Sequence, residues 1–243
     1  MRERPGKAVH GLTIGILILD TKFERVPGDT GYAQTWPFPV QYGVVRGATP
    51  ARVVEGDAAS MLENFVVAAE ELIDLGVDGL TTSCGFLAKI HKQLVARLPV
   101  PIATSSLLQI PLARSLLPPG KTVGVLTADR DSLTDAHFEG VGLKRDVPIV
   151  GMNPRGEFKR NVRTDSPTVD RAAQENETLL MAEELLTQNP TVGAIVSECT
   201  RLSPYSAAIQ KRFGVPVFDI VTLVTWLHAG LHPRTYQRGP AIG

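Results

Sequence analysis

The sequence has few cysteines, no excess of either charge and no long hydrophobic run. Two cysteines in 243 residues cannot form a disulfide framework, and two thiols alone cannot complete a structural zinc site, which takes about four ligands. Twenty-five basic residues balance 25 acidic residues, so the formal net charge is zero. A neutral chain lacks the positive surface that nucleic acid or an anionic membrane attracts, and we expect neither as a partner.

Membrane, export and cofactor signals are also missing. No apolar run approaches the roughly 18 residues that span a bilayer, and the run over 12–19 ends in Asp20 without a small-residue cleavage site. The chain has no glycine-rich dinucleotide motif after a strand, no P-loop and no lysine in a pyridoxal phosphate motif. We therefore expect a cytoplasmic enzyme or binding protein with free thiols that uses no cofactor and no metal.

What the chain does contain is one cysteine motif that occurs twice. Cys84 and Cys199 each close a short apolar run and each begin a segment with helical periodicity. The two cysteines are 115 residues apart, as are Pro101 and Pro216, each of which lies in the next apolar run. This pattern indicates a duplicated half-protein with one thiol at the same position in each half.

The rest of the chain alternates apolar runs with helical patterns, and the order restarts after Pro118-Pro119-Gly120. The clearest helices are predicted over 58–75, 86–98, 172–186, 204–213 and 221–229. Two polar stretches, 20–39 and 153–170, show no apolar period and are predicted as long loops at equivalent places in the two halves.

Such alternation favours an α/β fold with parallel strands. We predict two pseudo-symmetric lobes, each a short, mostly parallel sheet flanked by helices, with the active site in the cleft between them. The first lobe would comprise 1–104 together with the C-terminal segment 217–243, and the second lobe 105–216. Ligands of such sheets bind at the carboxyl ends of the strands, where both cysteines lie.

Two thiols in one cleft would be suited to acid–base chemistry. The N–H groups and partial positive charge at the start of a helix stabilise a thiolate, which can accept a proton. With a thiolate on one side of a substrate carbon and a thiol on the other, a proton leaves one face and another arrives at the opposite face. Without a cofactor, hydrogen bonds from hydroxyl and backbone N–H groups at the strand ends would stabilise the carbanion.

On these residues the sequence resembles the aspartate/glutamate/hydantoin racemase superfamily, over nearly the whole chain. Asp20-Thr21 after the first strand is similar to an Asp-Ser pair of glutamate racemases, and Cys199-Thr200 to the Cys-Thr of their second motif. The resemblance implies a cofactor-independent racemase or epimerase of an amino acid or related carboxylate, and a homodimer. Two departures, Cys84-Gly85-Phe86 in place of Cys-Asn-Thr and Arg201 in place of an acid or histidine, indicate altered substrate recognition.

We accordingly predict Cys84 and Cys199 as the catalytic acid and base. The predicted substrate-binding residues lie at the strand ends beside them: Asp20, Thr21, Ser83, Gly85, Phe86, Thr127, Glu198 and Thr200. Two alternatives within the superfamily remain open, a maleate-type cis–trans isomerase and an arylmalonate-type decarboxylase. An alternative of another class is a small-molecule-binding or redox-sensing protein.

Overall fold

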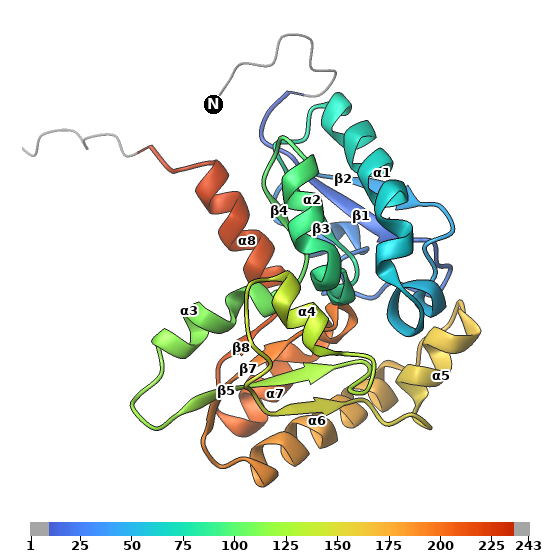
Figure 1. The fold of residues 1–243 in the computed structure, drawn as a ribbon. Helices are drawn as coiled ribbons and strands as arrows, with labels where there is room; N and C mark the ends of the chain where they lie inside the picture. The colour runs from blue at the N-terminus through green and yellow to red at the C-terminus, as the bar shows by residue number, and fades with distance from the viewer. Residues whose placement is uncertain (1–9, 236–243) are drawn as a thin grey trace, which may run out of the picture.

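Two four-stranded parallel sheets form the framework of the protein (Figure 1). The computed structural model describes residues 10–235; residues 1–9 and 236–243, which the sequence analysis assigned to the first lobe, lie outside the described residues. The strand orders are β2-β1-β3-β4 in the first lobe and β6-β5-β7-β8 in the second, so the topology is the same in both. The strands are β1 Ile14–Leu19, β2 Val40–Val45, β3 Gly79–Thr82, β4 Ile102–Ala103, β5 Thr122–Thr127, β6 Ile149–Gly151, β7 Val192–Ser197 and β8 Val217–Phe218.

Helices cover the sheets, as the alternating pattern predicted. The α-helices are α1 Leu62–Leu75, α2 His91–Arg97, α3 Ile110–Ser115, α4 Asp135–Gly140, α5 Glu157–Thr164, α6 Arg171–Gln188, α7 Ser206–Phe213 and α8 Ile220–Leu231. Shorter turns are the 3₁₀ segments η1 Ala33–Thr35, η3 Ala58–Met61, η4 Gly85–Ile90, η5 Ser106–Gln109 and η6 Thr200–Tyr205, and the π segment η2 Ala51–Glu55. Within residues 10–235, none of these helices has the length and apolarity needed to cross a membrane.

The central strands are apolar because both of their faces are covered. In β1 every residue except Ile18 is buried, and in β7 every residue except Gly193. β8 pairs with β7, whereas α8, which follows it, contacts β3 and β4 of the first sheet as well as β8. The last helix therefore connects the two lobes.

The polar stretch over 153–170 was predicted as a loop, and this prediction was wrong because the stretch contains α5. Phe158 and Val162 are one helical turn apart, and Phe158 is fully buried. The carboxylate of Glu177, on α6, accepts hydrogen bonds from the backbone N–H groups of Glu157 and Phe158 and so caps the start of α5. That cap comes from a distant residue, so no local pattern could reveal it.

A close backbone contact joins the lobes where α4 meets η4. A Cβ atom added at Gly140, in α4, would lie 2.0 Å from the carbonyl oxygen of Ala88, in η4. Only glycine therefore permits this approach of the second lobe to the segment that follows Cys84.

Gly140→Ala should consequently destabilise the protein, by about 1–3 kcal/mol, because the added methyl overlaps backbone that cannot rotate away. Gly230→Ala is the matched control, since Gly230 is also helical but has no atom within 4 Å of an added Cβ. Urea unfolding of both variants measures the effect. Equal free energies of unfolding for the two variants would show that the contact between α4 and η4 does not constrain the fold.

Candidate active site

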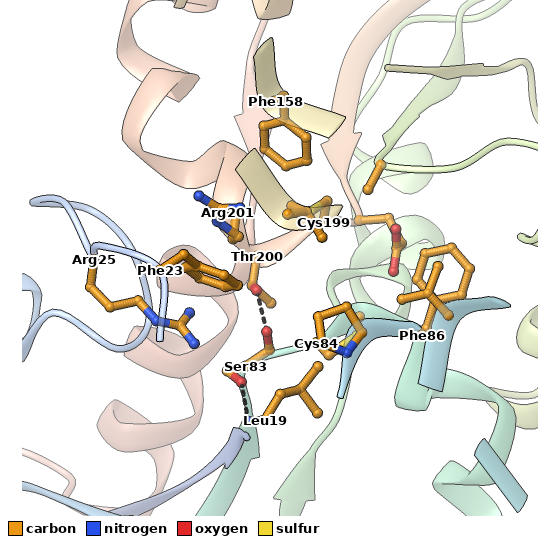
Figure 2. Close-up of a pocket in the computed structure, with 16 residues that line it drawn as sticks. Leu19, Phe23, Arg25, Ser83, Cys84, Phe86, Phe158, Cys199, Thr200 and Arg201 are labelled. Carbon is orange, nitrogen blue, oxygen red and sulfur yellow. Dashed lines mark hydrogen bonds between the residues drawn. The ribbon is translucent and has the colours of Figure 1, made fainter. Parts of the chain in front are cut away.

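Both cysteines line one cavity between the lobes (Figure 2). Its lining is mostly carbon. Six residues adjacent to the two cysteines in sequence line it as well: Ser83, Gly85, Phe86, Glu198, Thr200 and Arg201. The structure thus brings together two thiols from positions 115 residues apart, and both are free.

Equivalent backbone hydrogen bonds place the two thiols. The residue before each cysteine donates its N–H to the neighbouring central strand: Ser83 to the carbonyl of Leu17, at 2.9 Å, and Glu198 to that of Leu126, at 2.8 Å. Each cysteine is extended, and the 3₁₀ segment that follows it turns the chain away from the sheet. The cysteines therefore occupy the same position in their lobes.

One buried hydrogen bond joins the two motifs directly. The hydroxyl of Thr200 donates to the carbonyl of Ser83 across the lobe boundary, at 2.6 Å. The Ser83 hydroxyl in turn accepts the N–H of Leu19, at 3.0 Å. The residue after one cysteine is thus bonded to the residue before the other, which fixes how the two sulfurs face the cavity.

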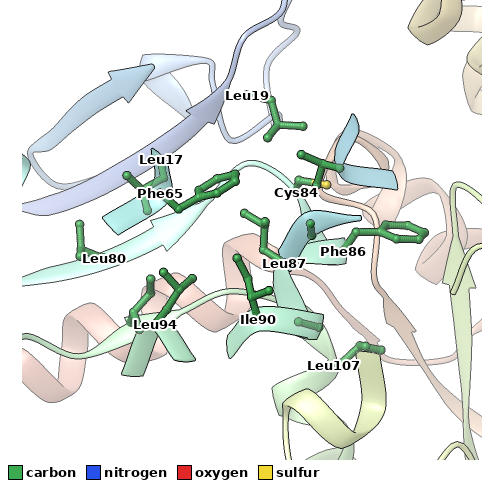
Figure 3. Close-up of a cluster of buried hydrophobic side chains, with 14 of the residues drawn as sticks. Leu17, Leu19, Phe65, Leu80, Cys84, Phe86, Leu87, Ile90, Leu94 and Leu107 are labelled. Carbon is green, nitrogen blue, oxygen red and sulfur yellow. The ribbon is translucent and has the colours of Figure 1, made fainter. Parts of the chain in front are cut away.

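Cys84 is also backed by the hydrophobic core. It is 8% exposed and belongs to a buried cluster with Leu17, Phe65 and Leu87, which also includes residues of the second lobe such as Phe138 (Figure 3). The core therefore holds the first thiol in place and removes it from water.

Glu198 lies fully buried beside both thiols. Its Oε2 accepts a hydrogen bond of 2.6 Å from the hydroxyl of Thr127, while its Oε1 has no partner. A Cβ atom at Gly85 would lie 2.2 Å from Oε1, so glycine next to Cys84 is what makes room for this carboxyl group. Burial raises the pKa of Glu198 to about 7, and the bond from Thr127 opposes part of that rise.

The thiols are less acidic than the sequence led us to expect. Burial raises the pKa of both cysteines, that of Cys199 to about 12, and the nearby Glu198 charge raises them further. The backbone N–H groups of Phe86 and Arg201 bond to the sulfurs of Cys84 and Cys199 respectively and oppose the rise. The expected N–H groups are therefore present, but the loss of water outweighs them.

A buried guanidinium forms one end of the cavity. Arg201 is 8% exposed and stacks on the ring of Phe23, 3.9 Å from its centroid, with the ring of Phe158 5.1 Å away. Its Nη2 donates to Asn161 Oδ1 at 2.7 Å, and its Nε lies 4.0 Å from Asp29 Oδ2, whereas Nη1 has no partner. Its charge favours a thiolate at Cys199.

Three predicted binding residues lie outside the cavity lining. Asp20 accepts the N–H of Gly47 at 2.9 Å and lines a neighbouring cavity instead. Thr21 accepts a hydrogen bond of 2.9 Å from Arg25, which does line the cavity, and Thr127 holds Glu198. Thr21 and Thr127 thus position lining residues, while Asp20 helps to shape the loop before η2.

The sequence prediction missed the apolar wall and two charged residues, Arg25 and Arg201; Arg201 was noted as a departure from the family motif but was not among the predicted binding residues. The missed residues outside the cysteine motifs lie in both lobes. They are Leu19 at the end of β1, Phe23 and Arg25 in the loop after it, Pro50 before η2 and Val54 within it, Ala128 after β5, and Phe158 and Val162 in α5. The spacing of Phe158 and Val162 was a helical signal for α5, but nothing in the sequence placed that helix against the first lobe.

The protonation of Glu198 should appear as a pH dependence of stability. A carboxyl group whose pKa is higher in the folded state than in the unfolded state stabilises the fold below the unfolded value, near 4.5, and this stabilisation is lost as the pH rises through about 7. The free energy of unfolding of the wild type should therefore fall, relative to that of Glu198→Gln, by about 3 kcal/mol over this range. Urea unfolding at a series of pH values measures the difference; parallel curves would mean that Glu198 is ionised throughout.

Known proteins resemble this chain in sequence and in structure. No family model matches the chain. A dimethylsulfoniopropionate lyase from Durusdinium sp. clade D is 26% identical over 242 residues, covering 95% of this chain and 80% of the relative. Dimethylsulfoniopropionate lyase 2 from Emiliania huxleyi is 26% identical, covering 90% of this chain and 72% of the relative.

Solved structures share the architecture at lower identity. Allantoin racemase from Klebsiella pneumoniae has a TM-score of 0.63 at 14% identity, covering 91% of this chain and 87% of its own. Arylmalonate decarboxylase has a TM-score of 0.58 at 16% identity, with 94% and 96% covered. Glutamate racemase from Francisella tularensis has a TM-score of 0.54 at 17% identity, with 90% and 80% covered. The chain therefore has the two-lobed α/β fold of these racemases and of arylmalonate decarboxylase, which is the fold that the sequence resemblance implied.

Proposed function

We propose that this protein is an enzyme that removes a proton from the carbon next to the carboxylate of a small substrate, with a cysteine as the base. The observation that carries the proposal is that two thiols, equivalent in the two lobes, line one cavity with a buried arginine at its side. The unpartnered Nη1 of Arg201 is suited to hold the carboxylate. A carbon next to a carboxylate is a weak acid, so its ionisation needs both a strong base and a nearby positive charge.

Cys199 is the better candidate for the base. The positive charge of Arg201 lowers the pKa of Cys199 and so favours its thiolate. At Cys84 the favourable charge is that of Arg25, and it has the smallest effect of the groups that shift the pKa of this thiol. A thiolate with a raised pKa is scarce at neutral pH, but it is a stronger base once formed. Burial therefore makes the Cys199 thiolate a stronger base but a less populated one.

The sequence relatives favour β-elimination as the reaction, with dimethylsulfoniopropionate as the substrate. Cys199 would take a proton from the carbon next to the carboxylate, and the electrons of that C–H bond would form the carbon–carbon double bond. The bond from the next carbon to the sulfonium sulfur would break and its electron pair would leave with dimethyl sulfide. Acrylate would remain, and Cys199 would return its proton to solvent.

Racemisation or epimerisation is the second candidate, and the presence of both thiols favours it. Elimination requires one base, whereas inversion at a stereocentre requires a donor on the opposite face, which Cys84 would supply. The two reactions share the first step and differ in whether the carbanion loses a leaving group or regains a proton.

Replacement of the cysteines should separate these reactions. For elimination, Cys199→Ala should lower kcat/KM for acrylate formation by about 10²–10⁴-fold, because a positioned general base contributes that much, and Cys84→Ala should have a clearly smaller effect. For racemisation, both variants should abolish inversion, with one-sided deuterium exchange from solvent remaining in one of them. Acrylate release and deuterium incorporation at the carbon next to the carboxylate are the measurements. Full turnover of both single variants would overturn the cysteine mechanism.

The pH profile should report the thiol. Because the pKa of Cys199 in the free enzyme is raised to about 12, the thiolate fraction grows about tenfold per pH unit below that value. Log kcat/KM should therefore rise between about pH 8 and 10 with a slope near one, after subtraction of the rate of Cys199→Ala as the alkaline background. A flat profile over this range would exclude a thiol base with a raised pKa.

A further inference from the structure

The cavity contains two buried charged groups, each with one atom that has no partner. Among the described residues, eight buried side-chain nitrogen or oxygen atoms lack a hydrogen-bond partner, and those that belong to residues lining this cavity are Glu198 Oε1 and Arg201 Nη1. Leaving a buried polar atom unpaired costs free energy, so each needs an explanation. The two groups have opposite formal charge, which indicates a ligand that carries both signs.

The Arg201 side can bind only a hydrogen-bond acceptor, and its positive charge favours an anionic one. Asn161 and Asp29 hold Nη2 and Nε on the side of the guanidinium away from Nη1, and the ring of Phe23 covers one face. A guanidinium has donors and no acceptor. In Figure 2, Arg201 lies with Phe23 and Phe158 on one side of the two cysteines and Phe86 lies on the other.

The Glu198 side is suited to a cation without N–H groups. Of the residues that line the cavity, Glu198 is the one with a carboxylate, and its Oε1 lies against Gly85, next to Phe86. The hydroxyl of Ser83 already accepts the N–H of Leu19, and the carbonyl of Ser83 accepts the hydroxyl of Thr200. A primary ammonium has three donors to satisfy, whereas the methyl groups of an alkylated onium need only apolar and aromatic contacts beside one negative charge.

We propose that the cavity selects a small onium carboxylate, with its carboxylate on Arg201 Nη1 and its alkylated cationic group between Glu198 and Phe86. The inference rests on the proposed function, because it assigns the two ends of the substrate whose central carbon the thiols would deprotonate. It makes Glu198 and Arg201 the residues that determine specificity.

The linked protonation of Glu198 supports this assignment. With no ligand, burial raises the pKa of Glu198 to about 7, so about half of the molecules are protonated there at pH 7. A cation placed beside the carboxyl group stabilises its ionised form. Binding of an onium should therefore release about half a proton at pH 7, whereas a ligand with a neutral tail should release none.

Two ligands of the same shape test the charge preference. 3-(Trimethylammonio)propanoate carries the onium, and 4,4-dimethylpentanoate has carbon in place of nitrogen. Calorimetry on the wild type should show at least tenfold tighter binding of the onium and, in two buffers of different ionisation enthalpy, the expected proton release. In Glu198→Gln the preference should fall to twofold or less, while affinity for the neutral-tail ligand stays within about threefold and so shows that the cavity is intact.

Arg201→Gln should weaken both ligands at least tenfold and leave their ratio unchanged, and Arg201→Lys should recover part of the affinity. A wild type without onium preference, a preference that survives in Glu198→Gln, or equal proton release with both ligands would overturn the inference.

Failure of this inference can be told apart from failure of the proposed function. If the onium preference holds but both cysteine variants keep full turnover, the charge assignment stands and the cysteine mechanism falls. If the cysteine variants lose activity but the preference is absent, the reverse conclusion applies.

Discussion

The hydrogen bond from the Thr200 hydroxyl to the Ser83 carbonyl is the contact on which the site depends. It is buried, it crosses the lobe boundary, and it connects the residue after one cysteine to the residue before the other. Each lobe alone provides one thiol at the end of a central strand. The bond between the lobes, supported by the close approach of Gly140 to Ala88, makes two thiols into a pair around one cavity.

Dehydration of the charged and titratable groups is the second physical feature of the site. Cys84 and Glu198 are buried and Cys199 is half-buried, and the loss of water raises the pKa values of all three groups. Burial lowers the pKa of Arg201, while the charge of Asp29 opposes that fall and the aromatic faces of Phe23 and Phe158 favour the charged form. A site of this kind interacts strongly with the charges of a ligand, because few solvent dipoles are present to screen them.

The two halves share their topology but differ around the thiols. Gly85 follows Cys84 and leaves space, and Glu198 precedes Cys199 and fills that space with a carboxyl group. Arg201, two residues after Cys199, corresponds to the apolar Phe86 two residues after Cys84. A symmetric fold therefore carries an asymmetric distribution of charge, which is the property that would let it orient a substrate with two different ends.

Much of the architecture could be predicted because it depends on local and periodic patterns. The interval of 115 residues that separates Cys84 from Cys199 also separates Pro101 from Pro216, and it predicted two equivalent α/β lobes. The apolar runs before the cysteines predicted parallel strands, because such strands are buried on both faces. The sequence also singled out Glu198 and Thr200 as neighbours of a thiol. Helix α5, in contrast, depends on a cap from Glu177, and Asp20 bonds to Gly47 in the loop before η2 rather than lining the cavity.

The sequence by itself determined the number of thiols, their equivalent places at the strand ends and the residues beside them. Only the tertiary structure decided that Arg201 stacks on Phe23, that α5 closes the wall with Phe158, and that Glu198 is buried with one oxygen unpaired. The physical reason is that charge, pKa and access to water depend on what surrounds a group in space. Those surroundings are contributed by segments more than a hundred residues apart, whose contacts leave no periodic trace in the chain.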